Sequence, residues 1–368
     1  MDKINSNTRL FMKAVALFST LCSIEFGSAV SASACTGISL TSADGCYIQA
    51  RTIENAQEPL PSHWVVIPRG HKIQSFTPTG RNGLTFEAKY GVLGLTVVRE
   101  EFIAEGINEE GLSAGLFFFP DYGSYQRYEP AHNATSLGDL QVVAWILASF
   151  SSIDQVKQAV DGVRIIGLDK SAVVHWRIGE RSGRQVVMEI IDGQVHFYEN
   201  TVGVITNSPD FMWHLTNLNN YVNLRPGSAP DFRLSHFTLR PLGGSSGMLG
   251  LPGDATPPSR FVRAAFFRAT APTQPTGEQT ILQAFHLLNN FDVPIGIEHP
   301  EGKAPDMPSA TQWTSAIDLT NRRVYYKTAY NNSIRCIDLA KIDFSRVKYQ
   351  SHPLDREQRQ PIKYLLVE

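Results

Sequence analysis

The stretch Ala32-Ser33-Ala34-Cys35-Thr36-Gly37-Ile38-Ser39-Leu40 joins a segment with the features of an export signal to the first strand-forming segment of the chain. Ala32 and Ala34 supply the small-x-small pattern that precedes ordinary signal cleavage. Cleavage after Ala34 would make Cys35 the first residue of the mature protein. Cys35 would then carry a thiol and a free α-amino group only a few bonds apart.

The residues before this stretch have the order of a signal peptide. Three basic side chains precede the apolar run 14–24. Glu25 ends that run well short of the roughly 20 apolar residues that span a bilayer. We therefore predict that residues 1–34 are a signal peptide that is removed. The mature protein, 35–368, is expected to be exported to the periplasm or the extracellular space, without a membrane span.

An N-terminal cysteine combines a nucleophile with its own general base. An unperturbed α-amine titrates near pH ~7.7–8.0 and a thiol near ~8.5, so both exchange protons close to neutral pH. A cysteine in this position needs no histidine partner to become a nucleophile. Cys35 therefore predicts the chemistry of an N-terminal nucleophile hydrolase.

The same residues leave two other roles open for Cys35. A lipoprotein cysteine also follows a signal peptide directly, and lipidation would block the amine. A lipobox usually has Leu three residues before the cysteine, where this chain has Ala32. A buried structural cysteine that lies near the cleavage site by chance is the second alternative.

The composition is that of an ordinary globular protein. Of the 368 residues, 42% are hydrophobic and 18% charged, and the net charge is −2, so neither nucleic acid nor an anionic membrane is an expected partner. The length allows one large domain or two, and no linker divides it, so we predict a single domain over 35–368. The histidines are scattered and no metal-ligand motif is present, so we expect neither a metal nor a cofactor.

The mature chain has three cysteines, Cys35, Cys46 and Cys336. An oxidising compartment would permit at most one intramolecular disulfide among them. Only a bond between Cys46 and Cys336 leaves the candidate nucleophile free, and two buried reduced thiols are at least as compatible with the sequence.

Strand-forming and helix-forming patterns follow one another in blocks. A first hairpin over 36–41 and 46–53 turns at Asp44-Gly45 and would bring Arg51 near the mature N-terminus. Further strands are expected at 64–68, 91–98, 102–119 with a break at 108–111, 172–178, 185–191, 194–198, 202–207, 313–319, 324–328 and 334–337. Helices are expected at 140–150, from 152 onward, and at 211–222, 257–268 and 279–289. These blocks predict an α+β fold with two sheets packed face to face and helices outside.

One Gly-rich segment, 243–253, has no motif of a phosphate-binding loop. We expect it to form a close-packed loop.

Seven groups of residues carry a resemblance to a known family. They are Cys35-Thr36-Gly37, Arg51-Thr52-Ile53-Glu54, Asn108-Glu109-Glu110-Gly111-Leu112, Thr206-Asn207-Ser208-Pro209, 217–224, Leu251-Pro252-Gly253-Asp254 with Ser259-Arg260-Phe261, and Trp313-Thr314. In this order they resemble the choloylglycine hydrolase family, which contains bile salt hydrolases and penicillin V acylases within the N-terminal nucleophile superfamily. The similarity runs from Cys35 nearly to the C-terminus.

The resemblance implies a four-layer αββα sandwich, hydrolysis of a linear amide in a small acyl amide substrate, and assembly into homotetramers. It implies that Cys35 is the nucleophile and that Arg51 beside it favours the thiolate. Asn207 would donate a side-chain N–H to the tetrahedral oxyanion, a contact worth ~2.7–4 kcal/mol of barrier in another hydrolase. Arg260 would complete the charged network around the N-terminus.

Two positions depart from the commonest pattern of bile salt hydrolases. Glu54 stands where many members have Asp, and its longer side chain can still accept a hydrogen bond from the α-ammonium. Phe118 stands where many members have Asn, so the backbone N–H of Phe118 would have to serve the oxyanion with Asn207. Phe117, Phe118 and Phe119 are the candidate substrate-binding residues, because an aromatic site suits a steroid, phenoxyacetyl or fatty-acyl group. Strand alternation prevents all three from facing one way.

The first functional hypothesis is an exported N-terminal cysteine amidase that acts on conjugated bile salts or on penicillin V-like amides. A second keeps this mechanism with an N-acyl homoserine lactone as natural substrate. A third, from a different class, is a lipid-anchored binding protein that retains the fold without the chemistry. A papain-like protease has less support, because no Cys-Gly-Ser/Ala-Cys-Trp/Tyr segment surrounds Cys35.

Overall fold

The first hairpin forms where the sequence predicts it. The computed structural model describes residues 34–55, 60–169, 173–294 and 311–367. Strand β1 (Cys35–Thr41) pairs with β2 (Tyr47–Glu54) in antiparallel register, with Gly37 opposite Arg51. Gly45 in the turn has φ +84°, which glycine adopts without a Cβ clash. Both strands are buried along nearly their whole length, so other layers must cover both of their faces.

Six antiparallel strands form the first sheet, in the order β14-β1-β2-β17-β18-β19. The strands not yet given are β14 (Val204–Ile205), β17 (Thr311–Asp318), β18 (Arg323–Thr328) and β19 (Asn331–Asp338). The N-terminal hairpin therefore lies inside the sheet, with β14 on one side and β17 on the other.

Eight antiparallel strands form the second sheet, in the order β13-β12-β11-β8-β7-β6-β3-β20. They are β3 (His63–Ile67), β6 (Val92–Val97), β7 (Arg99–Asn108), β8 (Ser113–Phe118), β11 (Val174–Gly179), β12 (Gln185–Ile191), β13 (Gln194–Glu199) and β20 (Gln350–Pro353).

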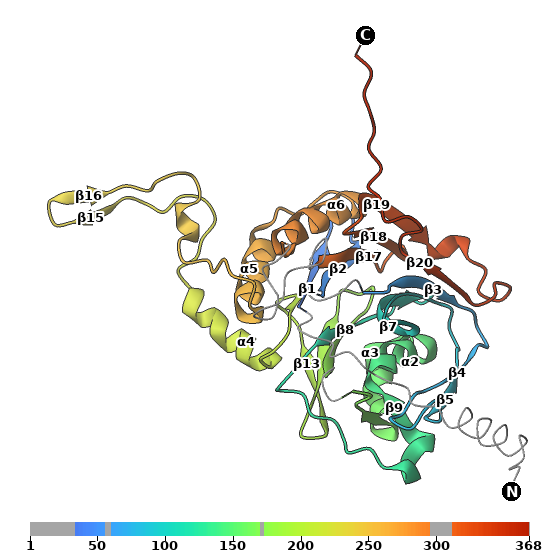
Figure 1. Cartoon of the computed structure of the whole chain (residues 1–368). Coiled ribbons are helices and arrows are strands. Elements are labelled where there is room, and N and C mark those ends of the chain that lie inside the picture. The colour runs from blue at the N-terminus through green and yellow to red at the C-terminus, as the bar shows by residue number, and fades with distance from the viewer. Residues whose placement is uncertain (1–33, 56–59, 170–172, 295–310, 368) are drawn as a thin grey trace, which may run out of the picture.

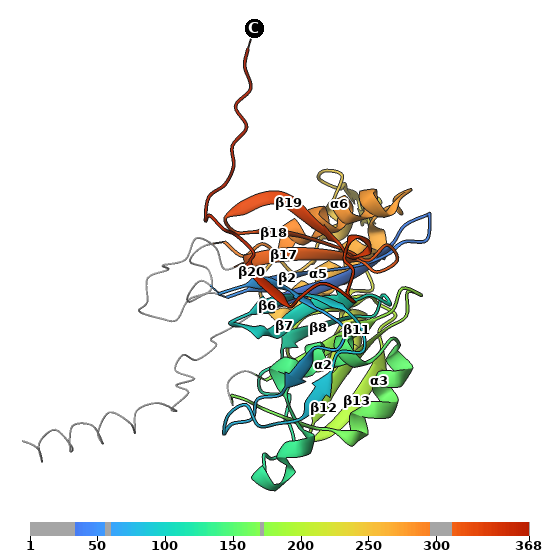
Figure 2. The ribbon, with the colours of Figure 1, turned by 90° about the vertical axis from the view of Figure 1, so that its right-hand side faces the viewer.

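The two sheets lie face to face, and helices cover their outer faces (Figure 2). Helices α5 (Pro257–Thr270) and α6 (Gly277–Leu288) pack on the first sheet, while α2 (Val142–Ser149) packs on β7 and β8 of the second. Helix α3 (Ile153–Ala159) lies on the same side as α2 (Figure 2). The predicted four-layer αββα sandwich is confirmed.

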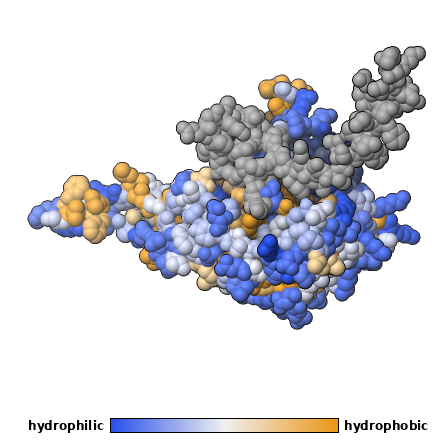
Figure 3. Space-filling model, turned by 60° about the horizontal axis from the view of Figure 1, so that its bottom comes forward, coloured by the Kyte–Doolittle hydropathy of each residue, from blue (hydrophilic) through white to orange (hydrophobic). Residues whose placement is uncertain are grey.

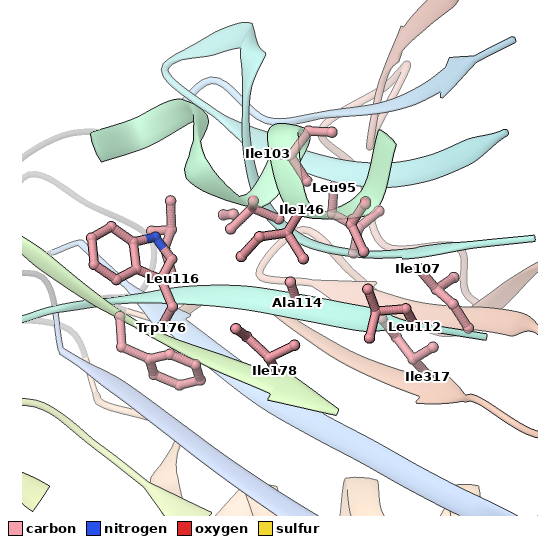
Figure 4. Close-up of a cluster of buried hydrophobic side chains, with 14 of the residues drawn as sticks. Leu95, Ile103, Ile107, Leu112, Ala114, Leu116, Ile146, Trp176, Ile178 and Ile317 are labelled. Atoms are coloured by element: carbon pink, nitrogen blue, oxygen red, sulfur yellow. The ribbon is translucent and has the colours of Figure 1, made fainter. Parts of the chain in front are cut away.

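An apolar cluster joins α2 to the second sheet (Figure 4). Ile146 of α2 lies over Leu116 and Ala114 of β8 and near Ile103 of β7, and all four side chains are buried. Full burial of an aliphatic side chain of this size contributes about 1.5–3 kcal/mol. These contacts hold β8 against α2, and β8 is the strand that ends at the candidate site.

The remaining elements are short. They are β4 (Lys72–Gln74), β5 (Thr85–Glu87), β9 (Ser136–Gly138), β10 (Arg164–Ile166), α4 (Phe211–Leu218) and the 3₁₀ helices η1 (Pro130–Thr135), η2 (Asp139–Gln141), η3 (Val160–Gly162), η4 (Asn219–Tyr221), η5 (Ser246–Met248), η6 (Asn289–Phe291) and η7 (Leu339–Lys341).

An arm between α4 and α5 was not predicted. It ends in the hairpin of β15 (Phe232–Leu234) and β16 (Phe237–Leu239), which extends away from the sandwich (Figure 1). The Gly-rich segment returns from this hairpin. Ser246 and Gly247 in it are buried, but Leu249 is 76% exposed, so the prediction of a close-packed loop is confirmed only at 246–247. A Cβ added at Gly243 or Gly244 would meet no neighbouring atom. Glycines permit an extended arm as readily as tight packing, and the sequence pattern does not distinguish the two.

Most predicted elements are confirmed with ends shifted by a few residues. The strand predicted at 202–207 pairs only over Val204–Ile205. The strand predicted at 172–178 is β11, and residue 172 lies outside the described part of the chain. Cys46 and Cys336 are both free thiols, the first buried and the second exposed, so no disulfide joins them.

Candidate active site

Cys35 is the first residue of β1 and is only 2% exposed. Its backbone nitrogen donates a hydrogen bond to Asn207 Oδ1 at 2.8 Å. Asn207 follows β14 closely, and the pairing of β14 with β1 brings it to the beginning of β1. The nitrogen that cleavage after Ala34 would convert to an α-amine therefore lies against a fixed acceptor.

Arg260 reaches the same atoms from the first sheet's helical layer. It lies in the first turn of α5, which begins at Pro257, and is 1% exposed. Its guanidinium donates to Cys35 O, to Thr36 Oγ1 at 2.9 Å and to Asn207 Oδ1 at 2.7 Å. The structure thus brings Cys35, Asn207 and Arg260 into one hydrogen-bonded group.

Arg51 on β2 extends its guanidinium into the space between the sheets. Its Nη1 donates to Ala104 O at 3.0 Å and to Leu116 O, and lies 3.6 Å from Glu105. The guanidinium carbon lies 4.0 Å from the centroid of the Phe117 ring. Within the described residues, the buried Nη2 has no hydrogen-bond partner. Arg51 therefore has an N–H available for a thiolate or a substrate.

Glu54 ends β2 and is fully buried. Its Oε1 lies 3.5 Å from Thr311 Oγ1 across the strand pair β2–β17. Its backbone N–H donates to Ala34 O at 2.9 Å, so Glu54 also holds the peptide that precedes Cys35.

Opposing effects act on the Cys35 thiol. Burial raises its pKa above the ordinary value, and this is the largest effect. The positive charge of Arg51 opposes it, the Glu54 carboxylate adds to it, and Arg260 and the backbone N–H of Phe118 lower the pKa. The net direction is upward even with both cations present, so the Cys35 thiol is protonated near neutral pH.

Strand β8 presents backbone groups to the site. β8 pairs with β7 only as far as Gly115. Beyond that residue, the backbone groups of β8 on the side of β7 do not pair with β7. Phe118 O accepts a hydrogen bond from Asn207 Nδ2 at 2.7 Å, and the Phe118 N–H is directed at the Cys35 thiol. Both expected oxyanion donors, the Asn207 amide and the Phe118 N–H, therefore meet at the end of β8.

The three candidate aromatic residues do not share one environment. Phe117 and Phe119 are fully buried, whereas Phe118 is partly exposed. The Phe117 ring packs against the guanidinium groups of Arg51 and Arg177, and Phe119 stacks on the His175 ring at 4.4 Å between centroids. Because side chains alternate along the strand, Phe118 faces away from the other two. Of the three, only Phe118 keeps exposed surface in this structure, and contact of the three side chains with a substrate stays a prediction.

A buried charge group behind Arg51 was missed at the sequence level. Glu105 on β7 lies 2.9 Å from Arg177 on β11 as well as 3.6 Å from Arg51. Arg177 also donates to Ile38 O and Ala50 O, both at 3.2 Å, so it joins the second sheet to the first. Glu105 lies within the otherwise apolar run 102–107, and this isolated carboxylate was the signal that could have identified it.

The residues that the structure describes contain neither a cluster of metal ligands nor a membrane-spanning helix. Among these residues, no group of three or more His, Cys, Asp or Glu side chains is arranged to hold a metal ion. In the same part of the chain, no helix has the length and apolar character needed to cross a membrane.

Comparison with known proteins gives a consistent result. The profile of the family described as linear amide C-N hydrolases, choloylglycine hydrolase family, matches residues 35–352. The bile salt hydrolase/transferase of Clostridium perfringens is 34% identical over 323 residues, which cover 85% of this chain and 95% of that protein. The penicillin V acylase of Pectobacterium atrosepticum is 25% identical, with 93% of this chain and 90% of that protein covered.

Solved structures agree on the fold. A conjugated bile acid hydrolase from Clostridium perfringens superposes with a TM-score of 0.79 at 30% identity, covering 90% of this chain and 100% of that one. The penicillin V acylase of Agrobacterium tumefaciens gives a TM-score of 0.70 at 22% identity, with coverage of 86% and 90%. The second likeness concerns the fold alone.

Proposed function

Because the chain belongs to the choloylglycine hydrolase family and is a hydrolase acting on linear amides, we propose that Cys35 is its nucleophile once residues 1–34 are removed. One observation carries this proposal. The backbone nitrogen of Cys35 lies 2.8 Å from Asn207 Oδ1, and Arg260 donates to the same oxygen. A free α-amine at this place would be held next to the thiol, with both groups inside a cationic, buried site.

The reaction begins with transfer of the thiol proton to the α-amine of Cys35. The sulfur then attacks the carbonyl carbon of the amide, and the resulting oxyanion accepts hydrogen bonds from Asn207 Nδ2 and the Phe118 N–H. The C–N bond breaks as the α-ammonium gives its proton to the leaving amine. Water adds to the thioester after giving a proton to the α-amine, the C–S bond breaks, and the acid leaves as the thiol is restored.

Arg51 and Glu54 support these steps without changing covalently. Arg51 lowers the pKa of the Cys35 thiol, and its unpaired Nη2 can donate to the thiolate or to a substrate oxygen. Glu54 would accept a hydrogen bond from the α-ammonium that carries the transferred proton.

We further propose that the protein is exported, that 35–368 is a single amidase domain, and that its substrates are conjugated bile salts or penicillin V-like acyl amides. The named activities of its relatives, a bile salt hydrolase/transferase and a penicillin V acylase, support this choice of substrates. The partly exposed Phe118 at the site suits an apolar acyl group.

The test combines the mature N-terminus with product analysis. Mass spectrometry of the secreted protein should find a free Cys35, and purified protein should release the acid from a conjugated bile salt, from penicillin V or from an N-acyl homoserine lactone. The Cys35→Ser variant should lose turnover by orders of magnitude, because a hydroxyl is a far weaker nucleophile near neutral pH.

The buried free thiol Cys46 provides the matched control. Cys46→Ser should retain the activity of the wild type. A diacylglyceryl adduct on Cys35, or full activity in Cys35→Ser, would refute the proposed nucleophile.

A further inference from the structure

Asn207 lies on a segment that the sheet holds only weakly. Strand β14 contributes two residues to the first sheet, Val204–Ile205, and ends before Thr206. The carbonyls of Thr206 and Asn207 therefore need partners other than a sheet ladder, because a buried carbonyl without one is costly. Both carbonyls bond to histidine side chains.

His175 on β11 bonds to the first carbonyl. Its Nε2 lies 3.1 Å from Thr206 O, and a carbonyl can only accept, so Nε2 carries a hydrogen. Its Nδ1 lies 3.0 Å from Glu189 Oε1 on β12. The ring is 1% exposed and stacks on Phe119 with an interplanar angle of 2°. These contacts fix the ring in both plane and rotation.

His214 on α4 bonds to the second carbonyl. Its Nε2 donates to Asn207 O at 2.8 Å. Burial lowers the pKa of His214 to about 4, so the ring is neutral near pH 7 and its one hydrogen is on Nε2. The ring stacks on Phe261 at 4.5 Å, and Phe261 follows Arg260 on α5.

Glu189 joins the two histidines into one unit. Its Oε1 is close to His175 Nδ1 and also accepts from the backbone N–H of Phe211 at 3.0 Å. Phe211 is the first residue of α4, the helix that carries His214. The position of α4, and with it His214, is thus set by the same carboxylate that orients His175.

We propose that His175 and His214 are positioning residues of the amidase, which hold the Thr206–Asn207 backbone so that the Asn207 amide reaches the oxyanion. This inference rests on the proposed role of Asn207. In this backbone position Asn207 Nδ2 lies 2.7 Å from Phe118 O, and the two histidines bond to the carbonyls on either side of the Asn207 Cα.

The principal test compares a variant of His214 that keeps the donor with one that removes it. His214→Gln keeps an N–H donor, and His214→Leu leaves Asn207 O without one. We expect kcat of His214→Leu to fall about 10–100-fold, since small misplacements of a catalytic group cost up to about 10²-fold. KM should stay within about threefold, and His214→Gln should recover most of kcat, because the donor acts on the transition state and not on substrate binding.

A second readout requires no turnover. The rate of Cys35 alkylation by iodoacetamide against pH reports the thiolate, and its midpoint should be the same in His214→Gln and the wild type. In His214→Leu the midpoint should shift, because a displaced Asn207 no longer holds the Cys35 nitrogen and Arg260. Crystal structures should show Asn207 Nδ2 bonded to Phe118 O in His214→Gln and displaced in His214→Leu. His71→Leu, at a half-buried histidine stacked on Tyr349, is the control for loss of an imidazole and should match the wild type.

His175 is tested with His175→Phe, which keeps the stacking on Phe119 and removes both hydrogen bonds. We expect the same loss of kcat and the same shift of the alkylation midpoint as in His214→Leu. The inference is overturned if His214→Leu keeps wild-type kcat, if His214→Gln falls as far as His214→Leu, or if Asn207 stays in place in the crystal structure of His214→Leu. Absence of amide turnover in the wild type itself would instead refute the proposed function, and the crystal structures would still decide the positioning role.

Discussion

Arg51 is one member of a buried group of two arginines and one glutamate. Arg51 and Arg177 share Glu105, and all three side chains are at most 1% exposed. Burial of a charge is costly unless it is paired, and here one carboxylate serves two guanidinium groups. The group therefore has a net positive charge between the sheets. Arg51, one of its members, lowers the pKa of the Cys35 thiol.

The variant Arg51→Ala tests this electrostatic role. Loss of the cation should raise the thiol pKa by about 1–3 units, because an adjacent opposite charge shifts a titration by that amount. The midpoint of Cys35 alkylation against pH measures the shift, and kcat/KM should fall with it. Glu105 keeps Arg177 as its partner at 2.9 Å, so the fold should persist.

Arg51→Lys is the matched control, since it keeps the charge and should keep the alkylation midpoint near that of the wild type. An unchanged midpoint in Arg51→Ala would show that Arg51 does not activate the thiol by its charge.

The 3₁₀ helix η2 depends on a buried carboxyl. Asp139 begins η2 and accepts from the backbone N–H of Leu140 at 3.0 Å and of Leu168 at 3.1 Å, which joins η2 to the loop after β10. Burial raises the pKa of Asp139 from 3.8 to about 7, against the lowering effect of these backbone donors. The folded protein therefore retains a proton that the unfolded chain releases at lower pH.

Unfolding as a function of pH tests this property. The stability contributed by the protonated Asp139 is fully present below pH 3.8 and is lost as the pH rises through about 7. The free energy of unfolding of the wild type relative to Asp139→Asn should thus decrease between pH 4 and 7.5. Each unit of difference between the folded and unfolded pKa of Asp139 is worth ~1.4 kcal/mol, so the decrease in the free energy of unfolding is at most about 4 kcal/mol. Urea titrations at several pH values measure it.

Asp254→Asn is the control with the opposite sign. Hydrogen bonds from Ser259 and Thr256 lower the pKa of Asp254 to about 2, so its contribution is already complete above pH 4. The stability difference for Asp254→Asn should be constant over the same range. A constant difference for Asp139→Asn would mean that this carboxyl is ionised in the folded protein.

The arm gives the whole molecule an apolar projection. Phe232 pairs with Leu239 and Leu234 with Phe237, so all four side chains lie on one face of the hairpin, and their exposed fractions run from 44% to 67% (Figure 3). A two-stranded hairpin is at best marginally stable alone in water, and exposed apolar patches mark interaction sites. We expect this face to contact another copy of the chain, in keeping with the implied homotetramer.

Light scattering of the double variant Phe232→Asp/Phe237→Asp measures this contact. Two carboxylates on the apolar face should reduce the assembly to a smaller species, because their desolvation opposes association. Arg233→Asp/Thr238→Asp changes the opposite face of the same hairpin and should leave the mass unchanged. A wild type that is monomeric at micromolar concentration, or an unchanged mass in the first variant, would contradict the expectation.

Local patterns along the chain predicted most of the secondary structure. The Asp44-Gly45 turn and the alternation of β-branched residues gave the first hairpin, and its register placed Arg51 near Cys35. The arm was missed, because its strands of three residues are too short for a periodic signal. The sequence also could not tell whether Phe117 and Phe119 pack in the core or face a substrate, since an aromatic run has the same pattern in a core and in a pocket.

What the sequence alone decided is therefore local. It decided the elements, the cleavage motif before Cys35 and the ordered residues that resemble the family. The tertiary structure decided which groups meet: Glu105 with two arginines, and His175 and His214 with the carbonyls beside Asn207. These partners are between 7 and 72 residues apart, and their contacts depend on how two sheets and a helix pack. The periodicity of a sequence shows only which face of a helix or strand is buried. It does not show which single side chains will meet when those elements pack, so these contacts could not be predicted.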